Sequence, residues 1–178
     1  MTDDELEKLN FADWPISDNY LIEVGRINTM WSNLESFLQI CIGKLSGFNE
    51  SHLIPFVFLQ HSSFPQKIDM LGALCDQQQA QHEHLKDFKR VIGLLRAAQA
   101  QRNKFIHNSL GSALDGSLQM PVGSARGMVK TSVETVSVAT MRRVTIQIDE
   151  ATGELYKLIL KREILPKWKR LQSGSGLI

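Results

Sequence analysis

The sequence predicts an all-α protein of four main, mostly antiparallel helices, with a small insert between the third helix and the fourth. Two long segments, residues 20–45 and 141–165, carry side chains at spacings that alternate between three and four, and these side chains are apolar except for Arg162. This period of about 3.5 residues is typical of helices that pack along one another. A third segment, residues 88–110, has an apolar stripe of its own. The 178 residues are enough for one domain with a sizeable core.

The chain is predicted to begin with an N-terminal arm, residues 1–15, in which Trp14 packs onto the body of the protein. The first main helix then starts at a cap formed by Ser17 or Asp18 and ends near Gly47. Its apolar seam predicts close packing along another helix. The seam consists of Tyr20, Val24, Ile27, Trp31, Leu34, Leu38, Cys41 and Leu45.

Two sequence features precede the second main helix: a short apolar segment and a helix start signal. Residues 52–60 come first, and their apolar composition predicts a short buried helix. The run Ser62-Ser63-Phe64-Pro65 combines a serine cap with a proline in the first turn. The second main helix is therefore expected over residues 66–79. The third is expected from Glu83 to Leu110.

Residues 111–136 form the insert, which glycines and a proline interrupt. Two short runs, residues 117–120 and 128–133, are expected to pair as a β-hairpin, and a partly ordered loop is the alternative. The fourth helix is expected to start near Ser137 or Thr140 and to end before Pro166. Residues 144–148 also alternate with a period of two, so a strand is the second interpretation there.

These elements predict one helical domain over residues 16–166, followed by a flexible tail over residues 167–178. The net charge of +1 gives no global attraction to nucleic acid or membrane. Cys41 and Cys75 lie within apolar helical patterns, which favours small buried side chains over a disulfide. Reduced thiols and an acidic start unlike a secretory signal predict a cytoplasmic protein without a membrane span.

The candidate site lies at the end of the third helix. Arg102 occupies a position where the apolar stripe calls for leucine, and a buried guanidinium needs a compensating partner. Asn103 and His107 are four residues apart, so they share a helix face, and the long Arg102 side chain can swing round to join them. A cation, an amide and an acid/base group are thus expected together.

The run Arg102-Asn103-Lys104-Phe105-Ile106-His107 resembles the signature of the HEPN superfamily, an arginine followed at a short interval by histidine, with a polar residue directly after the arginine. The resemblance includes the position at the end of a long helix, and it covers about residues 15–166. It implies a four-helix bundle that dimerises so that two copies of the motif form one cleft. The seam of the first helix and the apolar face of the third are the expected dimer surfaces.

The resemblance also implies a metal-independent endoribonuclease, in a toxin–antitoxin or phage-defence system with an antitoxin protein as a partner. His107 would act as acid or base, Arg102 would bind the phosphate, and Asn103 would orient His107 or hold a phosphate oxygen. Lys104, Asn108 and Lys130 are the predicted substrate-binding residues. No cofactor is expected.

Two other interpretations stay open at this stage. In the first, the domain binds a nucleotide, a nucleic acid or a protein without catalysis. In the second, Arg102 forms a core ion pair with a carboxylate such as Glu35, and the helix dipole stabilises His107. His82 and His84 are two residues apart and would lie on different helix faces, so no metal site is predicted. The basic run over residues 157–170 is more typical of a solvated helix face than of an RNA contact.

Overall fold

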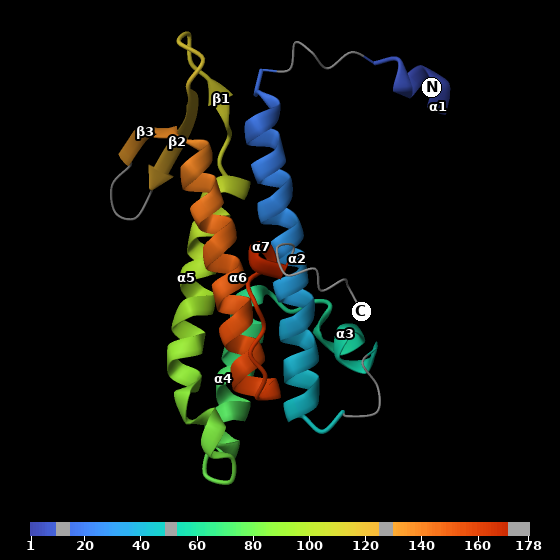
Figure 1. Ribbon diagram of the computed structural model, residues 1–178, viewed down its shortest axis with the longest axis vertical. Helices are drawn as coiled ribbons and strands as arrows, with labels where there is room; N and C mark the ends of the chain where they lie inside the picture. The colour runs from blue at the N-terminus through green and yellow to red at the C-terminus, as the bar shows by residue number, and fades with distance from the viewer. Residues whose placement is uncertain (10–14, 49–52, 125–129, 171–178) are drawn as a thin grey trace.

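The computed structural model describes residues 1–9, 15–48, 53–124 and 130–170, and it is largely helical, as predicted (Figure 1). A small antiparallel sheet interrupts the helices near one end of the molecule. The elements in chain order are α1 (Asp3–Glu7), α2 (Asp18–Leu45), α3 (Leu53–Leu59), α4 (Phe64–Gln78), the 3-10 helix η1 (Glu83–Asp87), α5 (Phe88–Ile106), β1 (Gly111–Ser112), β2 (Leu118–Ser124), β3 (Lys130–Val136), α6 (Val138–Leu160) and α7 (Lys167–Arg170).

Helices α2 and α6 lie side by side and run in the same direction (Figure 1). The Tyr20 hydroxyl near the start of α2 donates to the Val136 carbonyl, which precedes α6, at 3.2 Å. Further along, the rings of Phe37 and Tyr156 stack with centroids 3.7 Å apart. The predicted antiparallel order holds for α4–α5 and α5–α6 but is wrong for α2, because the chain doubles back through α3 before α4 begins.

The core fills the space between α2, α4, α5 and α6. Ile27, Leu34, Leu95, Ile148 and Leu155 are all 0% exposed. The predicted seam of α2 and the apolar face of α5 are therefore largely buried within one chain. The expectation that these two faces form a dimer is wrong, because burying them inside the monomer leaves neither available to a second copy.

The short helix α3 forms where it was predicted, but its burial was predicted wrongly. Only Pro55 and Leu59 are buried, whereas Leu53, Val57 and Phe58 are 75%, 68% and 73% exposed. A helix of two turns that docks one face on a neighbour leaves its opposite face in solvent. Here the outward face is as apolar as the inward one.

The two ends of the predicted third helix differ from expectation. Residues 83–87 form η1 and not an α-helix, and α5 ends at Ile106 instead of Leu110. The Asn108 side-chain amide donates to the Lys104 carbonyl at 2.7 Å, so it occupies an acceptor that a continuing helix would use. By contrast, Ser63 begins α4 with a capping box, as the sequence indicated.

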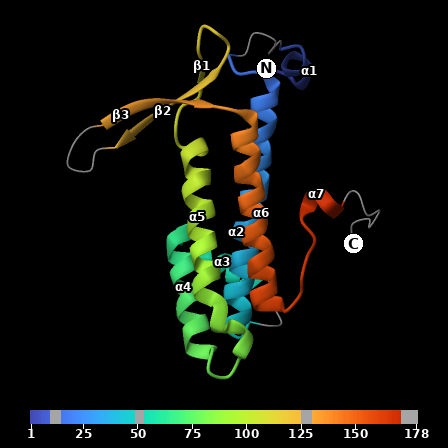
Figure 2. The ribbon, with the colours of Figure 1, turned by 60° about the vertical axis from the view of Figure 1, so that its left-hand side comes forward.

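The insert forms the predicted hairpin, extended to seven residues on each side. Strands β2 and β3 pair antiparallel, with Leu118 opposite Val136 and Ser124 opposite Lys130, and β1 joins the other edge of β2. Leu118, Met120 and Val136 are buried, so the sheet closes the end of the bundle at which α5 ends and α6 begins (Figure 2). Residues 125–129, which include the first two residues of the second predicted run, lie outside the described residues.

The C-terminal part departs further from prediction. Helix α6 is capped by Ser137 and includes residues 144–148, so the strand interpretation is wrong. It ends at Leu160, well before Pro166, because Lys161 adopts a left-handed conformation (φ 57°) that turns the chain back. Residues 167–170 form α7, so the tail is not irregular there. Residues 171–178, and Trp14 in the arm, lie outside the described residues.

The remaining general predictions concern the cysteines and the membrane. Cys41 and Cys75 are buried free thiols, as expected. Burial raises the pKa of both, and that of Cys75 rises to about 11. Within the described parts of the chain, the helices contain no apolar stretch that would reach across a bilayer.

A glycine-to-alanine pair on α2 tests the docking of α3. A methyl group on Gly43 would overlap the Pro55 ring, whereas one on Gly25 would meet nothing within 4 Å. Gly43→Ala is expected to lower the free energy of unfolding by about 1–3 kcal/mol. Gly25→Ala is expected to raise it by up to about 1 kcal/mol, because alanine favours helix. Urea denaturation measures both, and equal effects would contradict the packing of Pro55 on Gly43.

The buried thiol of Cys75 predicts a loss of stability at alkaline pH. The folded protein keeps this thiol protonated up to about pH 11, whereas the unfolded chain ionises it near the ordinary value of 9.0. The contribution of the protonated Cys75 thiol to the free energy of unfolding is complete below pH 9 and is lost as the pH rises towards 11. The free energy of unfolding of Cys75→Ala is expected to fall less steeply over this interval. Parallel pH profiles for the two proteins would refute this expectation.

Candidate functional site

The structure brings Arg102, Asn103 and His107 together at the C-terminal end of α5. The Arg102 Nη1 donates to Asn103 Oδ1 at 3.2 Å and lies 3.3 Å from His107 Nε2. His107 is the residue that caps α5, and its backbone N–H donates to the Asn103 carbonyl at 3.1 Å. The arginine side chain thus swings round as the sequence predicted, even though the helix ends one residue before the histidine.

The contact between Arg102 and His107 matches one tautomer of the neutral imidazole. A guanidinium can only donate hydrogen bonds, so Nε2 is the acceptor in this contact, which corresponds to the tautomer with its proton on Nδ1. His107 is exposed, and therefore the ring is open to an incoming molecule. An unprotonated nitrogen beside a fixed cation is an arrangement suited to removing a proton near an anionic group.

Arg102 itself packs against an aromatic ring. Its guanidinium carbon lies 5.4 Å from the centroid of the Trp31 ring on α2, within the range of a cation–π interaction. Its Nε is buried and has no hydrogen-bond partner. Burial lowers the pKa of Arg102, and the nearby Glu35 charge opposes that effect. The guanidinium stays charged at neutral pH, because its ordinary pKa is far above 7.

Glu35 does not form the predicted ion pair with Arg102. Its Oε1 accepts from the Lys67 ammonium of α4 at 2.7 Å, and Lys67 is only 3% exposed. The interpretation of Arg102 as the partner of Glu35 is therefore corrected, because a closer and more deeply buried cation occupies that carboxylate. Lys67 was missed in the sequence, although it adjoins Ile68 on the apolar face of α4, where a lysine is out of place.

The predicted substrate-binding residues lie near the motif, but two of them have partners within the chain. The Lys104 ammonium donates to Glu134 of β3 at 2.6 Å, and the Asn108 amide closes the end of α5. Lys130 opens β3 opposite Ser124, and its side chain is outside the described part of the structure. Glu134, which ties the sheet to α5, carries no sequence signal that would have indicated this role.

Helix α4 is too short to cover the end of α5 that carries the motif. Phe64, the first residue of α4, packs its ring 4.3 Å from that of Trp31, so α4 begins about halfway along α2. Figure 2 shows α4 alongside only the lower part of α5. Arg102 lies just beyond the start of α4, where that helix no longer covers the side of α5. Helix α4 therefore leaves the end of α5 that carries the motif uncovered, because of the helix lengths.

Comparison with protein-family models, curated proteins and solved structures finds no significant match to this chain. The chain's own residues and their geometry are therefore what indicate its function.

The Glu35–Lys67 pair predicts a difference between removing the anion and removing the cation. Glu35→Gln leaves a buried ammonium unpaired and is expected to lower the free energy of unfolding by about 2–3 kcal/mol, less than for a fully buried pair because Glu35 is 33% exposed. Lys67→Met replaces the ammonium with an apolar chain and is expected to change it by under about 1 kcal/mol. Denaturant titration measures both.

The matched control for this comparison is Asp69→Asn. It breaks an exposed pair, Asp69–Arg96, in which both side chains are more than 60% exposed. It is expected to change the free energy of unfolding by less than about 1 kcal/mol. If Glu35→Gln changed the free energy of unfolding as little as this control, the Glu35–Lys67 pair would not be a structural ion pair.

Proposed function

We propose that this protein is a HEPN-type, metal-independent endoribonuclease whose site is formed by Arg102, Asn103 and His107. One observation supports the proposal above all. A single guanidinium nitrogen of Arg102 contacts both Asn103 Oδ1 and His107 Nε2 at an exposed helix end. A cation and an imidazole in contact, both reachable from solvent, are the groups that cleavage of an RNA phosphodiester requires.

In the proposed reaction, the substrate phosphate draws the Arg102 guanidinium away from His107, and the freed Nε2 lone pair takes the proton from a ribose 2′-OH as the 2′-oxygen attacks the adjacent phosphorus. The bond to the 5′-oxygen breaks, which leaves a 2′,3′-cyclic phosphate and a 5′-hydroxyl end. Arg102 stabilises the negative charge on the phosphate oxygens as the phosphorane forms. Asn103 holds the guanidinium by accepting one of its N–H groups, so its role is to position Arg102.

One chain supplies one histidine to this reaction, and the leaving 5′-oxygen also needs a proton. A second copy of the protein, placed with its own His107 beside the first, would supply that acid. We therefore include a homodimer in the proposal, formed through a surface other than the seam of α2. The toxin–antitoxin or phage-defence setting, with an antitoxin as partner, belongs to the same proposal.

The second candidate is a non-catalytic module that binds nucleic acid, a nucleotide or a protein. Two observations favour it: Lys104 is already paired with Glu134, and Asn108 is used to end α5. Both reduce the number of free groups that would align an RNA chain for cleavage, which leaves Arg102 as a binding group. In this reading, Arg102 is an anion-binding residue and His107 is dispensable.

The proposal predicts cleavage of single-stranded RNA by the purified protein in the presence of EDTA. His107→Ala is expected to reduce the rate at least about 100-fold, the usual contribution of an acid/base group. Arg102→Ala is expected to reduce it by a similar or larger factor. Arg102→Lys is expected to restore part of the rate, because lysine keeps the charge but not the paired donors. Gel analysis of end-labelled RNA measures all three.

The matched control is Arg96→Ala, which removes an exposed arginine from the same helix but leaves the motif intact. It is expected to cut RNA at the rate of the unmodified protein. No cleavage by the unmodified protein, with RNA binding that survives His107→Ala but weakens in Arg102→Ala, would replace the nuclease with the binding module. Neither cleavage nor RNA binding would reject the nuclease and the nucleic-acid-binding form of the second candidate.

A further inference from the structure

A second candidate site lies where α2 and α6 meet. The carboxylate of Glu23 on α2 accepts hydrogen bonds from two arginines through the same oxygen, Oε1. Arg26 Nη1 donates at 2.6 Å from one turn further along α2, and Arg142 Nε donates at 2.8 Å from α6. Glu23 is only 1% exposed, whereas the two arginine side chains are 54% and 63% exposed. The two guanidinium groups thus converge on one buried anion and stay open to solvent.

Each of these arginines donates to Glu23 through a single nitrogen. Both bonds end on Oε1, and Oε2 is buried without a partner, so neither pair is the bidentate kind in which two guanidinium nitrogens meet two carboxylate oxygens. Among the described residues, no other carboxylate pairs with Arg26 or Arg142. A guanidinium has five N–H donors, so most of the donors on these two exposed side chains are available to a ligand.

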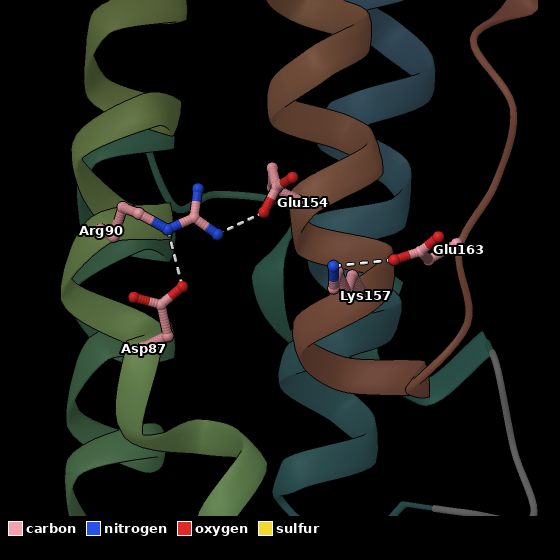
Figure 3. Close-up of polar contacts among 5 residues, drawn as sticks. All are labelled: Asp87, Arg90, Glu154, Lys157 and Glu163. Atoms are coloured by element: carbon pink, nitrogen blue, oxygen red, sulfur yellow. Dashed lines mark hydrogen bonds and ion pairs between the residues drawn. The ribbon is translucent and has the colours of Figure 1, made fainter.

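The charge balance at Glu23 differs from that at the other end of α6. Figure 3 shows the reverse arrangement there, in which Arg90 of α5 donates to two carboxylates, Asp87 and Glu154. The donors of Arg90 are thus directed to anions within the chain. At Glu23, by contrast, two cations share one carboxylate. One arginine would be enough to neutralise this buried charge, so one positive charge of the cluster is left unbalanced.

The cluster lies at the same end of the bundle as the candidate site on α5. Arg142 is near the start of α6, which begins beside the sheet. On α2, Glu23 precedes Trp31 by eight residues, or about 12 Å along the helix axis. Trp31 is the residue whose ring packs against Arg102. The two sites are therefore within the length of a short oligonucleotide of each other.

We propose that Arg26 and Arg142 form a clamp that binds one phosphate group. The two guanidinium groups offer paired N–H donors to the phosphate oxygens, while Glu23 keeps them together. A backbone phosphate of a nucleic acid carries one negative charge, which balances the unpaired positive charge of the cluster. The phosphate belongs to a bound RNA strand, and this assignment, unlike the clamp itself, rests on the nuclease proposed above.

A short RNA with 2′-O-methyl groups tests the clamp, because it has no 2′-OH and its binding is measured without cleavage. Fluorescence anisotropy gives its affinity for the full chain at several salt concentrations. The double variant Arg26→Gln/Arg142→Gln is expected to bind at least about 10-fold more weakly, with a salt dependence reduced by about 0.7 log units per log unit of salt, the contribution of one phosphate. Arg26→Lys/Arg142→Lys keeps the charge but not the paired donors, so it is expected to restore only part of the affinity.

The matched control is Lys86→Gln/Arg96→Gln, which removes two exposed cations elsewhere and is expected to bind like the unmodified protein. An equal loss of affinity in this control, or full affinity in the lysine variant, would overturn the clamp in favour of diffuse electrostatic attraction. Circular dichroism establishes that each variant is folded. The lysine variant keeps a cation at both positions beside Glu23, so it decides the question if the glutamine variant does not fold.

Calorimetric titration with inorganic phosphate distinguishes the two sources of the phosphate group. Binding of inorganic phosphate that is lost in the glutamine variant, while the affinity for the oligonucleotide is unchanged, would overturn the assignment to RNA and leave a site for free phosphate. The readout is also independent of catalysis. If the protein cut no RNA but the glutamine variant still lost affinity for the oligonucleotide, the nuclease would be rejected and the clamp retained.

Discussion

The parallel packing of α2 against α6 determines where the other elements lie. Because the two helices start at the same end, Tyr20 meets Val136, two residues before α6, and Phe37 meets Tyr156 further along. The chain must then bring α5 up between α4 and α6 and cross to the start of α6 at that same end. The sheet makes this crossing, and it therefore lies beside the end of α5 that carries Arg102 and His107.

Several charged groups sit within this apolar framework, and each joins elements that are distant in sequence. Lys67 of α4 pairs with Glu35 of α2, and the buried Glu23 accepts from Arg142 of α6 at 2.8 Å. Lys104 of α5 pairs with Glu134 of β3. Removing a partner is costly where it leaves a buried charge behind, as at Lys67 and Glu23, so these two pairs disfavour alternative arrangements of the helices.

The apolar periodicity of the sequence was sufficient to locate the main helices, because α2, α5 and α6 each bury one continuous stripe. Local signals also placed the start of α4 and the hairpin. The ends of α5 and α6 were predicted too late, since they depend on one side-chain hydrogen bond at Asn108 and one backbone conformation at Lys161. The convergence of Arg102 with its neighbours followed from helix geometry, but the competition of Lys67 for Glu35 required the position of α4.

The outward face of α3 affects how the protein behaves in solution. Leu53, Val57 and Phe58 are largely exposed on a helix that bears no charged residue. Adhesion between such surfaces is strengthened by sulfate, which is excluded from protein surfaces, and it weakens on cooling. Charge-driven contacts are instead screened by any salt. Solubility of this protein is therefore expected to depend on the identity of the salt as much as on its concentration.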